Sequence, residues 1–329
     1  MSQFRDIVGH KAIIEHLQDA IELKKISHAY IFEGEKGSGK KEIADAFSRA
    51  LECEEKGKDS CGICHSCVKA KSHSHPDIIW VEHEKENIIS VDEVRKRINN
   101  DIIIKPYSGP YKIYIVDEAE KLNEQAQNAL LKTIEEPPEY AVIILLTTNI
   151  GAFLPTIVSR CITLHLKPVE YKEVEKYILE HIDIDPDRVK FLVKYSMGNI
   201  GKAMRLAQSE EFDEMRKDCV HLLKYIDEMT EYEVIEYMKS LSKYKLEMTE
   251  FLDMMMMWYR DVLLLKATGN IDQIIFMEEY GKMKEQTIYK SYEQINNILM
   301  AFETAKKRLR ANVNFDTAIE LLLWEIKEN

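Results

Sequence analysis

The chain has 329 residues, which is enough for two or three domains that each bury a hydrophobic core. Its 45 Lys and Arg residues against 57 Asp and Glu residues give a formal net charge of −12, which argues against a protein that coats nucleic acid by charge alone. The apolar runs are far shorter than the ~18 residues that cross a bilayer, and residues 1–10 do not resemble a signal peptide. We therefore expect a soluble, cytoplasmic protein without membrane contact.

Strands and helices are expected to alternate in the first half of the chain. The strand-like runs lie at 28–32, 78–81, 112–116, 142–147 and 161–166. Apolar residues at helical spacing lie around and between them, at 4–26, 42–51, 91–98 and 123–134. Strands that alternate with helices predict a parallel sheet of the α/β class.

Beyond Pro168 no strand-like run recurs in the sequence. Helical patterns fill the rest of the chain, at 171–181, 187–195, from 201 onward, and at 210–226, 231–241, 246–268, 291–311 and 314–327. The last pattern places Phe315, Ile319 and Leu323 on one face, which is typical of a helix that packs on a core. We place domain boundaries near Leu166 and Gln208, which divides the chain into 1–166, 167–208 and 209–329.

A glycine-rich turn follows the first predicted strand directly. From Gly34 to Lys40 it reads GEKGSGK, and its position between a strand and a helix is that of a phosphate-binding loop. In such a loop Gly34, Gly37 and Gly39, with Ser38 between them, let backbone N–H groups turn inward onto phosphate oxygens. Lys40 would then reach the β and γ phosphates. The alternative is a plain glycine turn that joins a strand to a helix.

Position 41 departs from the pattern of the phosphate-binding loop. The pattern asks for Ser or Thr, whose hydroxyl coordinates Mg²⁺, and this chain has Lys41. A lysine cannot ligate a metal ion, and a second cation at this place competes with Mg²⁺ for the phosphate oxygens. We expect that nucleotide can still bind here while hydrolysis is impaired or absent, which leaves ATP with Mg²⁺ an open question.

Two later strand ends carry polar residues that suit nucleotide chemistry. Asp117 and Glu118 follow the strand at 112–116, where Asp117 would hold the metal through its water shell and Glu118, if not vestigial, would polarise the attacking water. Thr148 and Asn149 follow the strand at 142–147 and would lie beside the acidic pair, where they could sense the γ phosphate. The alternatives are a helix start for the acidic pair and a capped turn for Thr148 and Asn149.

Four of the six cysteines crowd into one short stretch, as Cys53, Cys61, Cys64 and Cys67. Two residues between thiolates let neighbouring cysteines reach one ion, and four thiolates complete the tetrahedral shell of a structural Zn²⁺. An iron–sulfur cluster is the alternative, although the usual cysteine run that ends in Cys-Pro is missing. The clustering favours metal ligation in a reducing compartment over disulfides.

Several segments together resemble the bacterial clamp-loader branch of the AAA+ ATPases. They are FRDIVGH at 4–10, HAYIFEG at 28–34, the phosphate loop, the four clustered cysteines, DEAE at 117–120, NALLKTIEEPP at 128–138 and LPTIVSRC at 154–161. The resemblance covers about the first 205 residues. It implies a RecA-like nucleotide-binding domain at 1–166 with an inserted zinc module at 53–67, a three-helix lid at 167–208, and an all-helical collar for oligomerisation at 209–329.

The resemblance implies one of two kinds of subunit. The motor subunit of the family keeps Ser or Thr after the loop lysine and an arginine in a Gly-x-x-Arg second sensor, whereas this chain has Lys41 and places Gly201 where that arginine would fall. Arg160 is similar to the finger that the family inserts into a neighbouring subunit's ATP site. The resemblance therefore favours a subunit that assembles with gamma/tau and delta, supplies Arg160 in trans, and helps load the sliding clamp onto primed DNA.

Two alternatives remain at the level of the sequence. One is a competent ATPase of the gamma/tau type, with Lys202 as a candidate substitute for the missing arginine, and the other is a non-replicative AAA+ switch. Residues 209–329 hold 24 acidic and 16 basic residues, so most of the acidic excess lies in the expected collar. We therefore expect this subunit to act on DNA mainly through its partners, with any direct contact made by a local basic face of the first domain.

Overall fold

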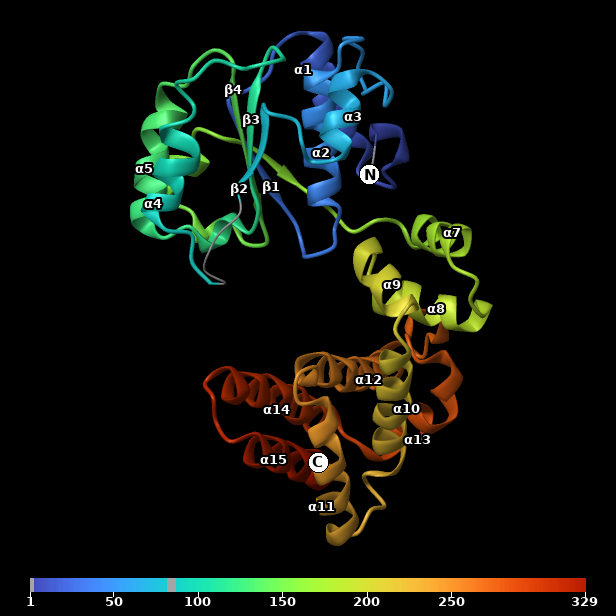
Figure 1. Ribbon diagram of the computed structural model, residues 1–329. Helices are drawn as coiled ribbons and strands as arrows, with labels where there is room; N and C mark the ends of the chain where they lie inside the picture. Colours follow the sequence, from blue (N-terminus) through green and yellow to red (C-terminus); the bar gives the residue numbers. More distant parts are fainter. Residues whose placement is uncertain (1–2, 82–86) are drawn as a thin grey trace. The chain divides into compact units, whose positions relative to one another are not determined.

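The computed structural model shown in Figure 1 describes residues 3–81 and 87–329. The chain folds into two compact units, of which the first comprises Met1–Ile184 and Ser196–Met204 and the second comprises Asp185–Tyr195 and Arg205–Asn329. The polypeptide therefore passes from one unit to the other three times. The finer division into three domains, with boundaries near Leu166 and Gln208, stays a prediction.

The first unit is built around a five-stranded sheet with the order β2-β3-β4-β1-β5. All neighbouring strands pair in parallel. The strands are β1 Ala29–Glu33, β2 Ile78–Val81, β3 Lys112–Val116, β4 Ala141–Thr147 and β5 Ile162–His165. These bounds agree within one residue with the runs expected from the sequence. The predicted parallel α/β fold is confirmed, and the fully buried strands β3 and β4 show why their sequences are almost continuously apolar.

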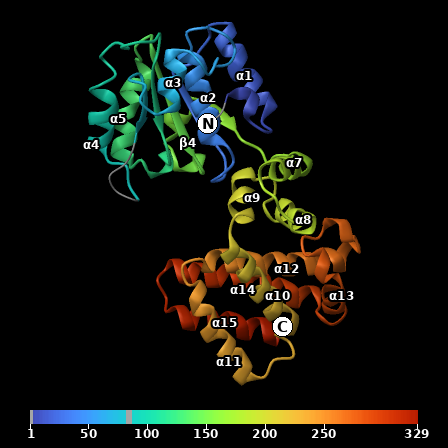
Figure 2. The same ribbon diagram turned by 45° about the vertical axis from the view of Figure 1, so that its right-hand side comes forward.

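Helices cover both faces of this sheet (Figure 1 and Figure 2). On one side lie α1 Lys11–Glu22, α2 Lys40–Glu52 and α3 His65–Lys71, and on the other lie α4 Val91–Val94 and α5 Glu124–Glu135. Strand β4 supplies both cores, because Ile143 and Leu145 pack under α4 and α5 while Val142 and Ile144 pack on the side of α2. The order of the strands also brings the carboxyl ends of β1, β3 and β4 to one edge, where ligands of such sheets bind.

Several elements of the first unit differ from the sequence-based expectation. The helix expected at 4–26 is a short turn, η1 Phe4–Asp6, followed by α1, and the two are separated by Gly9 and His10 at φ values of +76° and +53°. The helix expected at 91–98 changes from α4 to a wider turn, η2 Arg95–Asn99. Helix α3 was not expected at all, and it begins at His65, with the side chain of Cys64 as its N-cap.

The remaining elements of the first unit lie near the carboxyl edge of the sheet or follow it in the chain. They are η3 Ala119–Lys121, η4 Ile150–Ala152, α6 Pro155–Val158, α7 Tyr171–His181 and the start of α9 Ile200–Ala207.

The described part of the second unit is helical throughout. Its elements are α8 Pro186–Tyr195, the end of α9, α10 Glu210–Tyr225, α11 Glu231–Ser240, η5 Leu241–Tyr244, α12 Met248–Thr268, η6 Ile271–Gln273, η7 Met277–Glu279, α13 Tyr280–Tyr289, α14 Tyr292–Arg310 and α15 Phe315–Glu328. Trp258 and Tyr259 of α12 are completely buried, as are Met254 and Met255 of the methionine run. Among the residues that the structure describes, no helix combines the length and the apolar character that crossing a membrane requires.

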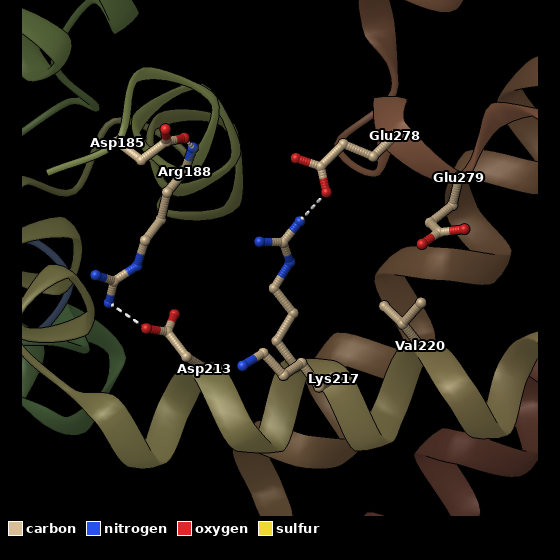
Figure 3. Close-up of a pocket in the computed structure, with 8 residues that line it drawn as sticks. Asp185, Arg188, Asp213, Lys217, Val220, Glu278 and Glu279 are labelled. Atoms are coloured by element: carbon tan, nitrogen blue, oxygen red, sulfur yellow. Dashed lines mark hydrogen bonds and ion pairs between the residues drawn. The ribbon is translucent and has the colours of Figure 1, made fainter.

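A charged pocket of about 370 Å³ lies beside α10 in the second unit (Figure 3). Arg188 of α8 pairs with Asp213 of α10 at 2.7 Å, and Arg216 of α10 pairs with Glu278 of η7 at 2.6 Å. The guanidinium carbon of Arg216 also lies 4.0 Å from the ring centre of Phe191. These contacts join α8 to α10 and η7, so the pocket is a structural junction within this unit.

Candidate nucleotide and metal sites

The glycine-rich loop between β1 and α2 has the backbone of a phosphate cradle. Gly37 and Gly39 have φ values of +86° and +98°, in the left-handed region where only glycine is relaxed. Gly39 is the N-cap of α2, so the loop leads directly into the first N–H groups of that helix. These N–H groups have no partner inside the helix and carry partial positive charge, which suits a phosphate group.

Lys40 is folded over this loop. Its Nζ donates hydrogen bonds to the carbonyl oxygens of Gly34 at 2.5 Å and Glu35 at 2.7 Å, and the residue is buried. Burial lowers the pKa of Lys40, and the carboxylates of Glu120 and Asp117 oppose that shift. The ammonium group is therefore held at the mouth of the cradle, beside the carbonyl oxygens of Gly34 and Glu35.

Lys41 forms an ion pair with Asp117, across the carboxyl edge of the sheet. The Nζ of Lys41 lies 2.6 Å from Oδ2 of Asp117. In a metal-binding loop these two positions would supply a hydroxyl ligand and a carboxylate for the water shell of Mg²⁺. Here the first is replaced by an ammonium group and the second is engaged by it, so residues 41 and 117 do not fit the metal.

The other predicted residues of this edge have local partners. Glu118 has a strained φ of +48°, and its Oε2 lies 2.6 Å from Nζ of Lys121. The hydroxyl of Thr148 donates to Oε1 of Glu120 at 2.6 Å, and Oδ1 of Asn149 accepts from the N–H of Gly151 at 2.9 Å. Asn149 therefore caps the turn that follows β4, which is the alternative that the sequence left open.

Residues 196–204 of the first unit close over the loop from another side. Asn199 donates from Nδ2 to the carbonyl oxygen of Lys36 at 2.9 Å, and the N–H of Gly201 donates to the carbonyl oxygen of Gly37 at 3.0 Å. Oδ1 of Asn199 accepts from the N–H of Lys202 at 2.9 Å, which fixes the first turn of α9. Asn199 is not among the residues expected from the sequence, because the pattern of this segment concerns only the arginine that the chain lacks.

His10 connects the segment before α1 to the same loop. Its Nε2 lies 2.9 Å from the carbonyl oxygen of Ser38, so this nitrogen carries the proton. Burial lowers the pKa of His10. The hydroxyl of Ser38 is buried and has no hydrogen-bond partner among the described residues.

Arg160 follows α6 and remains 41 % exposed at its side chain. One guanidinium nitrogen donates to the carbonyl oxygen of Thr156 at 2.9 Å, and the other lies 3.0 Å from Oε1 of Glu135 at the end of α5. The guanidinium group is thus oriented from two sides and still open to solvent.

The four clustered cysteines come together as the spacing predicts. One sulfur from each of Cys53, Cys61, Cys64 and Cys67 lies within 4.8 Å of the others, and all four are free thiols. The backbone N–H of Cys61 points at Sγ of Cys53 and that of Cys64 points at Sγ of Cys61, both at 3.3 Å. Backbone hydrogen bonds from Ile63 and then Cys64 lower the pKa of Cys61 to about 7. Soft thiolates in this arrangement fit a tetrahedral zinc ion.

A second cluster, of Glu52, His75 and Asp77, lies buried near the cysteines. Most of its groups are engaged by the protein, although Oε2 of Glu52 is buried without a hydrogen-bond partner among the described residues. Asp77 accepts N–H groups from the segment 107–109, and Nδ1 of His75 accepts the N–H of Asp77. The other ring nitrogen of His75 lies 3.1 Å from the hydroxyl of Ser66 in α3, and burial raises the pKa of Glu52 to about 8. The hydrogen bonds that His75 makes with Ser66 and Asp77 tie α3 to the segment before β2.

The chain is similar to known subunits of DNA polymerase III. A family model described as "DNA polymerase III, delta subunit" matches residues 9–170. DNA polymerase III subunit delta' of Bacillus subtilis is 29% identical over 96% of this chain and 95% of its own length. DNA polymerase III subunit tau of the same organism is 28% identical over 96% of this chain, and that of Escherichia coli is 32% identical over 62%.

The chain spans only 61% and 32% of these two tau subunits. Among solved structures, a DNA polymerase III gamma subunit-related protein of Thermotoga maritima aligns with a TM-score of 0.48 at 18% identity, covering 96% of this chain and 98% of that one. The clamp loader delta protein of Bacillus subtilis aligns with a TM-score of 0.37 at 13% identity, covering 96% and 100%.

Proposed function

The chain belongs to the family of DNA polymerase III clamp-loader subunits, and we propose that it acts in that family as a subunit of the delta' type. It assembles with gamma/tau and delta subunits and helps load the sliding clamp onto primed DNA. It does not itself hydrolyse ATP with Mg²⁺.

The ion pair between Lys41 and Asp117 carries this proposal. Phosphoryl transfer in nucleotide-binding loops depends on a metal ion that bridges the β and γ phosphates and neutralises the developing charge. An ammonium group 2.6 Å from the carboxylate of Asp117 takes the place of that ion. The similarity to delta' of Bacillus subtilis extends over 95% of the length of that subunit, whereas the similarity to tau extends over only 61% of its length. This difference supports the same assignment.

We infer that Arg160 acts on a neighbouring subunit. Its guanidinium group is exposed and already oriented by Thr156 and Glu135. An arginine supplied in trans stabilises the charge of the transition state and raises the rate by about 10³ to 10⁵ in systems where it has been measured. In this proposal the subunit promotes hydrolysis at a site other than its own.

We also propose that Cys53, Cys61, Cys64 and Cys67 hold one structural Zn²⁺. Residues 53–64 have no helix or strand, so a metal ion would tie together a segment that lacks a regular backbone hydrogen-bond pattern. Four thiolates leave no open position on the ion, so we assign it no catalytic step.

Assembly and turnover of the purified full-length chain test the assignment. We expect the chain to enter a complex with gamma/tau and delta subunits in size-exclusion chromatography. We expect its ATP turnover with Mg²⁺, measured alone, to match that of Lys40→Ala. Robust turnover that Lys40→Ala abolishes would support the gamma/tau alternative, and failure to assemble would refute the clamp-loader role.

A further inference from the structure

The phosphate loop retains its groups for binding phosphate although residues 41 and 117 do not fit a metal ion. The backbone of Gly37 and Gly39 forms the cradle, α2 presents its first N–H groups, and Lys40 is held at the mouth. The buried hydroxyl of Ser38 adds a polar group without a partner among the described residues. A loop that only joins a strand to a helix needs none of these features.

Lys41 is placed to replace a metal ion electrostatically. Its ammonium group has three N–H donors and no acceptor, so it binds anions and repels a divalent cation. One donor reaches Asp117 at 2.6 Å, which places the ammonium group beside that carboxylate while 61% of the Lys41 side chain stays exposed. The other two donors remain for oxygen atoms of a phosphate chain, while Asp117 is no longer available to the water shell of Mg²⁺.

We propose that this loop binds the polyphosphate chain of a nucleotide without a divalent metal, with the ammonium group of Lys41 in the metal's position. The inference rests on the proposed function, since it concerns the ligand of the same non-hydrolysing site. A metal-free polyphosphate carries the negative charge that Mg²⁺ would otherwise neutralise, and Lys40 and Lys41 supply the opposite charge. The bound nucleotide stays intact and serves as a fixed part of the subunit.

Calorimetric titration of the full-length chain with ATP and with inorganic pyrophosphate tests this inference. Divalent cations are removed from the buffer by a resin, and no chelator is added, because a chelator would also strip metal from the four cysteines. We expect both ligands to bind without Mg²⁺, and we expect excess Mg²⁺ not to strengthen binding. Stronger binding with Mg²⁺, or no binding of either ligand under any condition, overturns the inference.

The variant Lys41→Thr restores the hydroxyl of the usual pattern. We expect Mg²⁺ to strengthen ATP binding to this variant by about tenfold or more, and metal-free binding to weaken by a similar factor. The control Lys25→Thr removes the same charge before β1, at the opposite end of that strand, and is expected to bind as the unchanged protein does. If Lys41→Thr keeps the metal response of the unchanged protein, Lys41 does not replace the ion.

The variant Asp117→Asn provides a second measurement that does not depend on Lys41→Thr folding. Without a carboxylate to hold it, Lys41 still carries its charge, so metal-free binding of ATP is expected to persist. Loss of that binding contradicts the inference. Assembly with gamma/tau and delta is measured separately. If the chain assembles but its ATP binding depends on Mg²⁺, only this inference is refuted. If the chain fails to assemble, only the subunit assignment is refuted.

Discussion

Gly201 and Gly37 meet through their backbones at a point that has no room for a side chain. A Cβ atom on Gly201 would lie 2.6 Å from the carbonyl oxygen of Gly37, and one on Gly37 would lie 2.9 Å from Oδ1 of Asn199. The position where the motor subunits are expected to carry an arginine is thus occupied by the only residue that this contact tolerates. The contact brings residues 199–201 against the phosphate loop in place of a positively charged side chain.

We expect Gly201→Ala to destabilise the first unit by about 1–3 kcal/mol, because the backbone must move and the bond to Gly37 weakens. Hydrogen exchange of residues 34–40 and 196–204 should become faster. The control is Gly281→Ala on α13, where no atom lies within 4 Å of the new Cβ and a gain of about 0.5–1 kcal/mol is expected. Unchanged exchange in Gly201→Ala would show that the contact does not hold the loop.

The edge of the sheet where the candidate nucleotide residues lie could be predicted from the sequence, but several of their contacts could not. The order of strands in a parallel sheet places Asp117 and Asn149 at one edge, which follows from the alternating pattern. The ion pair of Lys41 with Asp117 depends on side-chain torsions, and the bond from Asn199 to Lys36 joins residues far apart in the chain. Periodicity and motif spacing contain neither kind of information.

The region of helix α3 was only partly predictable from the sequence. The spacing of the cysteines predicted that they meet, and they do. It did not predict the helix, because seven residues at 65–71 make two turns at most and its start depends on a cap from Cys64. The element therefore depends on the cluster as well as on its own sequence.

Metal analysis tests the proposed role of this cluster. We expect about one zinc ion per chain, and we expect a strong chelator to remove it and lower the melting temperature. Cys64→Ser should reduce the zinc content, whereas Cys161→Ser, outside the cluster, should keep it. A zinc content near zero in reduced protein would remove the four-cysteine site.

Helix α8 lies with the second unit because of its aromatic side chains. The ring of Phe191 stacks on Tyr195 at 5.5 Å and contacts Phe212 at 6.4 Å and Phe276 at 5.3 Å between ring centres. Apolar spacing predicted the helix itself within one residue. It could not predict which core receives the buried face, since that depends on side chains from α10 and from the segment before η7.

We expect Phe191→Ala to cost the second unit about 3–5 kcal/mol, because it removes a ring that lies at the centre of this cluster. The measurement is denaturant unfolding followed by the fluorescence of Trp258, which contacts Phe276 in the same cluster. The control Tyr171→Ala, at an exposed position of α7 in the first unit, should change stability by no more than about 0.5 kcal/mol. An equal effect of both changes would contradict the grouping.

Across the whole molecule, acidic and basic residues are distributed unevenly. The chain carries −12 overall, and residues 209–329 account for most of the acidic excess. That part of the chain forms helices with an apolar core and ion pairs, such as Lys290 with Asp227 and Lys306 with Asp253. A part of the chain with this net negative charge suits protein partners better than the phosphate backbones of nucleic acid.

Arg160→Ala in a complex reconstituted with gamma/tau and delta tests the action of the subunit on its neighbour. We expect the ATP site that faces Arg160 to hydrolyse ATP about 10³-fold more slowly. Total DNA-stimulated turnover should then fall by the fraction that this site contributes to it. Assembly should be unchanged, because the guanidinium contacts only Thr156, Ser159 and Glu135 among the described residues. Arg160→Lys keeps the charge and should recover part of the rate. Full turnover in Arg160→Ala would exclude the finger.

The four sulfur atoms that suit a metal ion are also close enough to react with one another. Sγ of Cys61 and Sγ of Cys67 lie 4.0 Å apart, and the lowered pKa of Cys61 makes it the most readily ionised of this pair. In the presence of an oxidant, a chain without metal at these cysteines can therefore close a disulfide, which would block the proposed zinc site until the disulfide is reduced. Metal content and oxidation would then change together as a preparation ages.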